Sequence, residues 1–192
     1  MSRKLATDPT ALRNAVNDQL PGWAGAWASG ATSVDGLLRW IVADLDRMPA
    51  LSVHDAEFRH YGSGYASFVD VFITKRDGSM RQSENGWTNV EGLPLVLSRL
   101  APLAALFKPD IQASGPSGAG SRGMPELSLV TDTALPSWEE EYRQIHQVLD
   151  RHDIALLDSQ VLSLPLEAEL RPETVLGRPP YRVFDAWFHW MD

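Results

Sequence analysis

The sequence contains no cysteine and only three lysines among its 192 residues. The absence of cysteine excludes disulfides, thiolate catalysis and cysteine-ligated zinc or iron–sulfur centres. The few lysines and the dispersed arginines argue against nucleic-acid binding, because proteins that bind nucleic acids gather basic side chains on one face. The sequence has no basic amphipathic helix either, which argues against binding to a membrane surface.

Long apolar runs are also missing. No stretch reaches the roughly 18 apolar residues that mark a membrane-spanning helix, and the first residues, Met1–Asp8, lack the apolar core of a signal peptide. We therefore expect a cytoplasmic protein. A hydrophobic content of 44% is enough for a real core, in one large domain or in two small ones.

Catalytic and metal-binding motifs are missing as well. The sequence has no nucleophile elbow, phosphate-binding loop, dinucleotide fingerprint or His-Glu-x-x-His motif. His54 and His60 lie too far apart on a strand to share a metal. His146 and Asp150 form a helical pair of a kind that is common on solvated helix surfaces. We therefore expect no catalytic residue, no metal and no cofactor.

The negative charge of the chain is concentrated in its second part. The formal net charge is −8, and residues 1–108 carry 11 basic and 11 acidic side chains, whereas residues 109–192 carry 6 and 14. An acidic surface repels phosphates and attracts basic partners. Two interpretations remain, ordinary solubility or a surface that binds a basic protein.

The first fifty residues predict two helices. Asp8 is a good N-cap for a helix over 9–20, which a Pro-Gly pair then ends. Apolar residues recur at helical spacing over 33–48, which predicts the second helix. Between the two, Trp23 and Trp27 are four residues apart, and core packing is their expected role.

A change to strand periodicity follows these helices. Apolar side chains occupy both faces of the segment 64–75, which predicts a central strand. Asp77-Gly78 then favours a tight hairpin turn into a second strand over 79–83. Residues 52–61 are a further strand candidate, which would precede both and complete a meander.

The middle of the chain is apolar and then rich in small residues. The segment 93–107 predicts a helix that Pro102 kinks or breaks. Residues 109–125 are rich in glycine, serine and proline, which predicts a flexible linker or a long surface loop. We therefore expect a region 1–108 of helices and a β-hairpin, this linker, and an acidic αβ region 126–192 that can also form one domain with the first.

The acidic region predicts one helix and several short strands. Ser137 and Glu140 are spaced as a capping box, and the apolar stripe that follows predicts a helix over 138–151. A short strand is expected over 127–131. The remaining strand candidates are 154–157, 161–170 and the first half of 181–190, where a helical stripe is the alternative.

The candidate partner-binding residues are six carboxylates. Two begin the helix 138–151, where their charge also complements the helix dipole, and two follow at its other end. The last two alternate along the predicted strand 161–170 and would project from one face. These residues are Glu139, Glu140, Asp150, Asp153, Glu167 and Glu169.

The aromatic C-terminus carries a resemblance. Residues 179–192 hold five aromatic side chains, which predict a structural element or a contact surface. The ending Tyr181–Asp192, preceded by the helix 138–149 and the strand 154–157, resembles the close of small bacterial immunity proteins from polymorphic toxin and contact-dependent inhibition systems. The resemblance implies a cytoplasmic protein without enzymatic activity, which blocks a toxin by covering its active site or an exosite.

Together these observations predict an α+β protein with a central mixed or antiparallel sheet flanked by helices, in one body or in two lobes. The preferred function is that of an immunity protein, which binds a basic toxin domain through an acidic surface. Two alternatives remain, a structural or regulatory interaction module unrelated to toxins, and an enzyme whose site is built from dispersed residues. The oligomeric state stays open.

Overall fold

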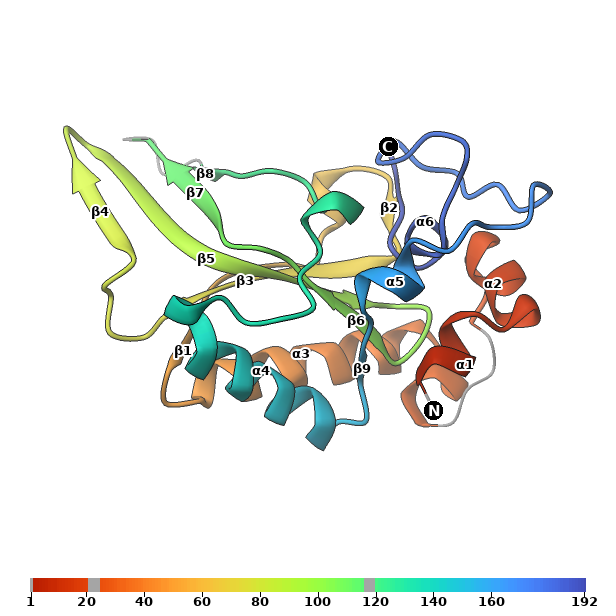
Figure 1. Ribbon diagram of the computed structural model, residues 1–192, viewed down its shortest axis with the longest axis horizontal. Helices are drawn as coiled ribbons and strands as arrows, with labels where there is room; N and C mark the ends of the chain where they lie inside the picture. The colour runs from red at the N-terminus through yellow and green to blue at the C-terminus, as the bar shows by residue number, and fades with distance from the viewer. Residues whose placement is uncertain (1, 21–24, 116–119) are drawn as a thin grey trace.

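The computed structural model describes residues 2–20, 25–115 and 120–192, and its centre is a mixed sheet of eight strands (Figure 1). The main path runs β1-β3-β5-β6-β9. Neighbouring strands on this path are antiparallel except β6 and β9, which are parallel. The strands are β1 (Leu51–Glu57), β3 (Phe68–Lys75), β5 (Trp87–Ser98), β6 (Leu103–Leu106) and β9 (Ala155–Leu156). The predicted α+β class with a mixed sheet is therefore confirmed.

Strand β5 is the longest and has different neighbours along its two halves. Its second half lies between β3 and β6. Its first half lies between β4 (Arg81–Glu84) and β7 (Asp110–Ser114), and β7 also pairs with β8 (Gly120–Ser121). The neighbours change around Gly92 and Pro94. A Cβ atom at Gly92 would lie 2.6 Å from the carbonyl oxygen of Ile73, so only glycine fits there.

One face of the sheet is covered by helices α3 (Ala31–Arg47) and α4 (Glu139–Arg151). Leu38, Ile41 and Leu45 of α3 are fully buried against this face, as the helical spacing predicts. Trp138, in the short 3-10 turn η4 (Pro136–Trp138) before α4, is 1% exposed. Both long predicted helices are therefore confirmed. Trp27, in η1 (Gly25–Ala28), joins the same core, whereas Trp23 lies outside the described residues.

The opposite face is covered by short elements from both ends of the chain. Helix α2 (Pro9–Val16) begins at Asp8, whose carboxylate accepts the Ala11 N–H at 2.8 Å, as the cap predicts. The C-terminal strand β10 (Trp190–Met191) pairs with β2 (Tyr65–Ala66), which follows η2 (His60–Gly62). The other short elements are α1 (Ser2–Ala6), η3 (Leu127–Leu129), α5 (Ser159–Leu162) and α6 (Val183–Trp187).

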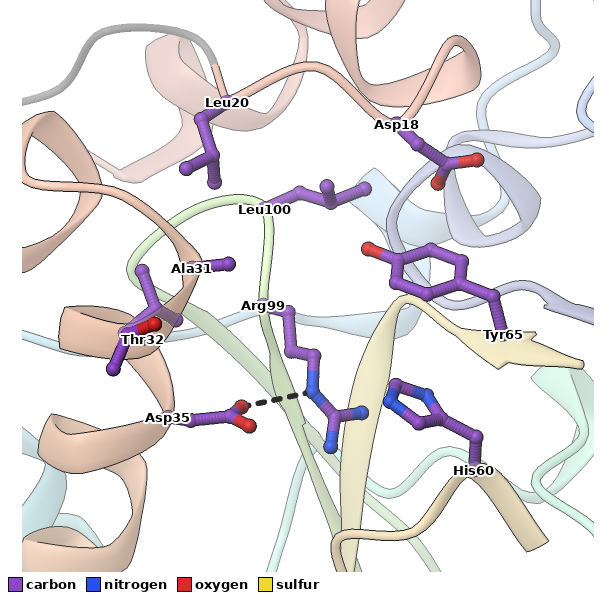
Figure 2. Close-up of a pocket in the computed structure, with 10 residues that line it drawn as sticks. Asp18, Leu20, Ala31, Thr32, Asp35, His60, Tyr65, Arg99 and Leu100 are labelled. Atoms are coloured by element: carbon purple, nitrogen blue, oxygen red, sulfur yellow. Dashed lines mark hydrogen bonds and ion pairs between the residues drawn. The ribbon is translucent and has the colours of Figure 1, made fainter. Parts of the chain in front are cut away.

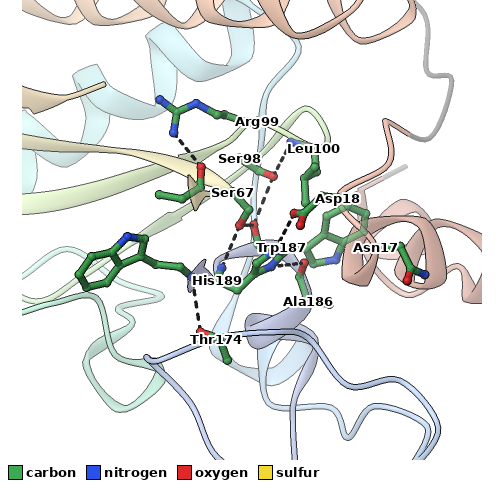
Figure 3. A network of polar contacts seen from close by, with 12 residues as sticks. Asn17, Asp18, Ser67, Ser98, Arg99, Leu100, Thr174, Ala186, Trp187 and His189 are labelled. Atoms are coloured by element: carbon green, nitrogen blue, oxygen red, sulfur yellow. Dashed lines mark hydrogen bonds and ion pairs between the residues drawn. The ribbon is translucent and has the colours of Figure 1, made fainter. Parts of the chain in front are cut away.

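The aromatic C-terminus is anchored in this second layer by a buried polar network (Figure 3). The indole N–H of Trp187 donates to the carbonyl of Ala6 at 3.0 Å, which ties the two ends of the chain together. The Ser67 hydroxyl donates to the carbonyl of Trp187 at 3.1 Å and accepts the N–H of His189 at 2.9 Å. Trp187 and Phe188 are fully buried, so these aromatic residues belong to the core.

Two of the predicted elements around β5 are wrong. The segment 93–107 is not a helix but the end of β5 followed by β6, and Pro102 lies in the turn between them. Both faces of these strands are buried, so their apolar run has no alternation that could distinguish a strand from a helix. The predicted hairpin through Asp77-Gly78 is also wrong, because β4 pairs with β5 and not with β3. The hairpin turn is Asn85-Gly86, where both residues have positive φ.

Corrections are also needed in the acidic region. Residues 161–170 contain the end of α5 and irregular chain rather than a strand, and 127–131 is a 3-10 turn with an isolated bridge from Val130 to Phe107. The expected capping box is absent, since Trp138 takes the N-cap position of α4 and makes no side-chain cap bond. The aromatic segment forms α6 instead of a strand, because the Asp185 carboxylate accepts the Arg182 N–H at 2.7 Å and caps that helix.

Candidate functional site

A three-stranded part of the sheet projects beyond the two long helices. It consists of β4, the first half of β5 and β7, and Figure 1 shows β4 and β5 reaching past the ends of α3 and α4. The projection follows from the chain length of β5, whose twelve residues exceed the span that the helices cover. The described part of the chain gives β4 no neighbour other than β5, so β4 is an edge strand with free backbone groups.

One face of this projection combines exposed apolar and acidic side chains. Residues of β5 alternate, so Trp87, Asn89 and Glu91 continue the side of the sheet on which Leu93 and Leu95 pack beneath the helices. The register adds the opposing residues of β4 and β7. We call this surface the ribbon face; its residues are Gln82, Glu84, Trp87, Asn89, Glu91, Ile111 and Ala113.

Trp87 and Ile111 are the large apolar residues of the ribbon face. They are 55% and 54% exposed, whereas large apolar side chains are usually buried in the core. The Trp87 ring lies against the backbone of Gly115, where a Cβ atom would come within 3.3 Å of the indole. Beside Trp87, residues of β4 and the Asn85 turn line a shallow hollow of about 420 Å³. The indole is thus held in place on one side and open to solvent on the other.

The first turn of α4 borders the ribbon face. The end of β3 connects the two, because the Thr74 hydroxyl donates to the Glu91 carbonyl at 2.8 Å and the Lys75 ammonium lies 3.6 Å from the Glu141 carboxylate. Glu139 and Glu140 are exposed in the same helical turn. The Glu140 carboxylate pairs with Arg143 at 2.6 Å, and the pKa of Glu140 is lowered by this hydrogen bond. Two of the predicted acidic residues therefore lie in the helical turn that borders the ribbon face.

The other four predicted residues lie elsewhere on the surface. Asp150 and Asp153 are exposed at the far end of α4, about 17 Å along the helix axis from its first turn. Glu167 and Glu169 are exposed in irregular chain after α5, so the expected alternation along a strand is wrong. The structure therefore does not bring the six carboxylates together in one patch.

The reverse side of the sheet contains a buried ion pair that the sequence analysis did not predict. Asp70 of β3 is 1% exposed, and its carboxylate lies 2.7 Å from the Arg122 guanidinium and accepts the Tyr61 hydroxyl at 2.9 Å. Burial raises the pKa of Asp70, and the positive charge of Arg122 opposes this effect. The Arg122 guanidinium also lies over the Phe72 ring, 5.0 Å from its centroid. Arg122 follows β8, so this pair holds the segment after β8 against the sheet.

The histidines are spread over separate structural contacts. His54 packs edge-on against Phe72, His146 lies against Tyr142, and His152 contacts the Asp44 carboxylate at 2.8 Å. Burial lowers the pKa of His54 and of His146. Within residues 2–20, 25–115 and 120–192, no group of three or more His, Asp or Glu side chains is arranged to hold a metal ion. Among the described helices, none combines the length and the hydrophobicity that a membrane span requires.

Comparisons with known proteins found no relative. No protein family, no curated protein and no solved structure matches the chain.

Proposed function

We propose that this chain is a non-catalytic binding protein that uses the ribbon face to hold a basic segment of another protein. Its most concrete form is a bacterial immunity protein that neutralises a toxin domain. The observation that carries the proposal is Trp87, a large apolar side chain that is fixed against Gly115 yet 55% exposed.

The apolar residues supply the binding energy in this proposal. Tryptophan is enriched among the residues that dominate protein interfaces, and such anchors sit at the centre of a polar rim. Trp87 and Ile111 fit this role, with polar and acidic side chains around them. Covering both would remove two large apolar groups from water, at roughly 25 cal/mol for each Å² that is buried.

The charges around these anchors select the partner. Glu84 and Glu91 lie on the ribbon face, and Glu139 is exposed in the first turn of α4. Lys75, at the end of β3, is already matched by Glu141 at 3.6 Å. Arg81 of β4 lies opposite Val90, which places it on the other face of the sheet. The surface is therefore complementary to a basic segment with apolar side chains, and the charges would mainly raise the rate of association. A toxin domain that acts on nucleic acid is a partner of this kind, because its active site must itself be basic.

The proposal can be tested by parallel affinity capture from the source cells. Three baits are compared, the wild-type chain, the double variant Trp87→Ala/Ile111→Ser, and Trp40→Ala. Trp40 lies on α3 away from the ribbon face and is 63% exposed, so it is a matched control for the loss of an exposed tryptophan. We expect one basic protein to be retained by the wild type and by Trp40→Ala and to be lost from the double variant.

The captured protein is then expressed in a heterologous host with and without this chain. An immunity protein restores growth of the host, and the double variant restores it poorly. The proposal is wrong if no protein depends on the ribbon face for capture. Its immunity form is wrong if the captured protein is harmless to the host, or if the double variant protects as well as the wild type.

A further inference from the structure

A second concave surface lies at the opposite end of β5 from the ribbon face. Trp87 begins β5, whereas Arg99 and Leu100 follow its last residue, so the two places are separated by the length of a twelve-residue strand. The pocket has a volume of about 440 Å³ and opens between the end of the α2 region, the start of α3 and β2 (Figure 2). A cavity of this size accommodates one small organic group or one long side chain.

The pocket walls are mainly apolar. Leu20, Leu100 and Ala31, which begins α3, supply apolar side chains to the lining. These groups favour a ligand with an apolar stem, because covering their surface removes it from water. A hydrated ion without such a stem would leave these walls in contact with water and gain nothing from them.

Two carboxylates, Asp18 and Asp35, line the pocket on opposite sides, and Figure 2 shows Asp35 directed toward Arg99. Each is held from inside the protein by a buried side chain. Arg99 Nε donates to Asp35 Oδ1 at 3.0 Å, and His189 Nε2 lies 2.8 Å from Asp18 Oδ1. The Asp35 side chain is 38% exposed and the Asp18 side chain is 30% exposed. Their positions are therefore fixed before any ligand arrives, which lowers the entropy cost of binding.

Arg99 does not make this an anion site. Besides Asp35, its guanidinium donates to the backbone carbonyls of Phe58, Ala66 and Phe68, so four of its five N–H groups are used and a bidentate bond to a ligand carboxylate or phosphate is prevented. Its side chain is 8% exposed. Arg99 therefore fixes the position of the Asp35 carboxylate. The charged side chains that remain partly exposed at the opening are those of Asp18 and Asp35.

Tyr65 and His60 form the remaining wall as a neutral aromatic pair. Their rings stack with centroids 5.4 Å apart. Burial raises the pKa of Tyr65 to about 12; the negative charge of Asp18 adds to this effect, the positive charge of Arg99 opposes it, and the negative charge of Asp35 contributes least. His60 accepts the Ala66 N–H through Nδ1 at 2.9 Å, and burial lowers its pKa, so the ring is neutral at pH 7.

From this geometry we infer that the pocket binds one alkylammonium or alkylguanidinium group. The cation lies in the part of the pocket that Asp18, Asp35 and Tyr65 line, and the alkyl stem lies along Leu20 and Leu100. The neutral aromatic face adds cation–π attraction at the same place. Such a group has two possible sources, a lysine or arginine side chain of a protein and a free small cation. The site stands independently of the ribbon face.

The test uses n-butylguanidinium and n-butylammonium as probes, with n-butanol as the neutral probe of similar shape. Binding is followed by chemical shifts in two-dimensional NMR spectra of the labelled full chain. We expect a Kd on the order of 1 mM for the cations, at least fivefold weaker binding of n-butanol, and shifts at Tyr65 and Leu100. The binding of the cations also weakens as salt is raised.

Variants separate the charge from the cavity. Asp18→Asn and Asp35→Asn should each weaken binding of the cations at least fivefold, and Asp150→Asn, which makes the same change on the exposed end of α4, should leave it unchanged. Asp18 and Asp35 also pair with the buried side chains of His189 and Arg99, so their replacement can disturb folding. A third variant therefore leaves both pairs intact. Ala31→Phe fills the pocket from an exposed position and should abolish binding while the thermal unfolding curve stays the same.

A capped peptide, acetyl-Gly-Arg-Gly-amide, distinguishes the two sources. Binding of the peptide at least as tight as that of n-butylguanidinium assigns the pocket to a protein side chain, and binding of the free cations alone assigns it to a small molecule. The inference is overturned if n-butanol binds as tightly as the cations, or if Ala31→Phe binds the cations as the wild type does.

Discussion

Replacing Arg122 with methionine should destabilise the fold strongly at neutral pH. The pair of Arg122 and Asp70 is almost fully buried, with side chains 9% and 2% exposed. Removing one partner of a buried ion pair leaves an uncompensated charge and costs about 3–5 kcal/mol. This is a large part of the roughly 5–15 kcal/mol by which typical domains are stable. The long methionine side chain keeps most of the packing against Phe72, so the loss of charge dominates.

The pH dependence of this variant identifies the cause. Burial raises the pKa of Asp70 in the folded protein, so the folded state holds its proton at a pH where the unfolded state has released it. Stability from this group therefore falls as pH rises from about 4 through the folded pKa. Without Arg122 the pKa of Asp70 in the folded protein rises further, so stability is lost over a wider pH range. The difference from the wild type should be small near pH 4 and should grow toward pH 8.

This difference is measured by urea unfolding, followed by tryptophan fluorescence at about pH 4.5 and about pH 8. The first value lies near the ordinary pKa of an aspartate, and the second lies well above it. The control is the double variant Asp70→Asn/Arg122→Met, which removes both charges. We expect it to be at least about 1.5 kcal/mol more stable at pH 8 than the sum of the two single variants predicts. The reasoning is refuted if Arg122→Met lies within about 0.5 kcal/mol of the wild type at pH 8, or if it loses the same stability at both pH values.

Two further variants test the packing. Trp187→Ala should cost about 3–5 kcal/mol or prevent folding, since the indole is fully buried and also bonds the Ala6 carbonyl; an unchanged midpoint of urea unfolding would place this residue outside the core. Gly92→Ala should cost about 1–3 kcal/mol, because the added Cβ meets the Ile73 carbonyl. Gly36→Ala, at an open helical position with nothing within 4 Å, is its control and should be neutral or stabilising.

The sequence predicted those elements whose two sides face different surroundings. Helices α3 and α4 have one buried and one exposed side, so their apolar residues recur at helical spacing. The end of β5 and all of β6 are buried on both sides, and this produced the erroneous helix over 93–107. The Asn85-Gly86 turn is a local signal that could have been used, because Asn-Gly is the preferred pair for a two-residue hairpin.

The candidate sites were harder to predict from the sequence, because they depend on contacts between residues that are far apart in the chain. Nothing near Asp70 in the sequence indicates that Arg122 meets it inside the protein. Likewise, Asp18, Asp35 and Tyr65 line one pocket only after β2 and the start of α3 have packed around Arg99. The exposure of Trp87 depends on the length of β5 beyond the helices, which composition and periodicity do not reveal. Of the predicted acidic residues, Glu139 and Glu140 border the ribbon face because β3 ends beside the first turn of α4.

The most direct test of the proposed function is the affinity of the captured partner for three purified proteins, the wild type, Trp87→Ala and Trp40→Ala. Surface plasmon resonance over a series of salt concentrations gives both rate constants. We predict that Trp87→Ala weakens the Kd at least about 30-fold, as expected for an anchor worth roughly 2 kcal/mol, and mainly through faster dissociation. The association rate of all three proteins should fall as salt is raised. Equal affinities for the wild type and Trp87→Ala would contradict the assignment of the ribbon face as the binding surface.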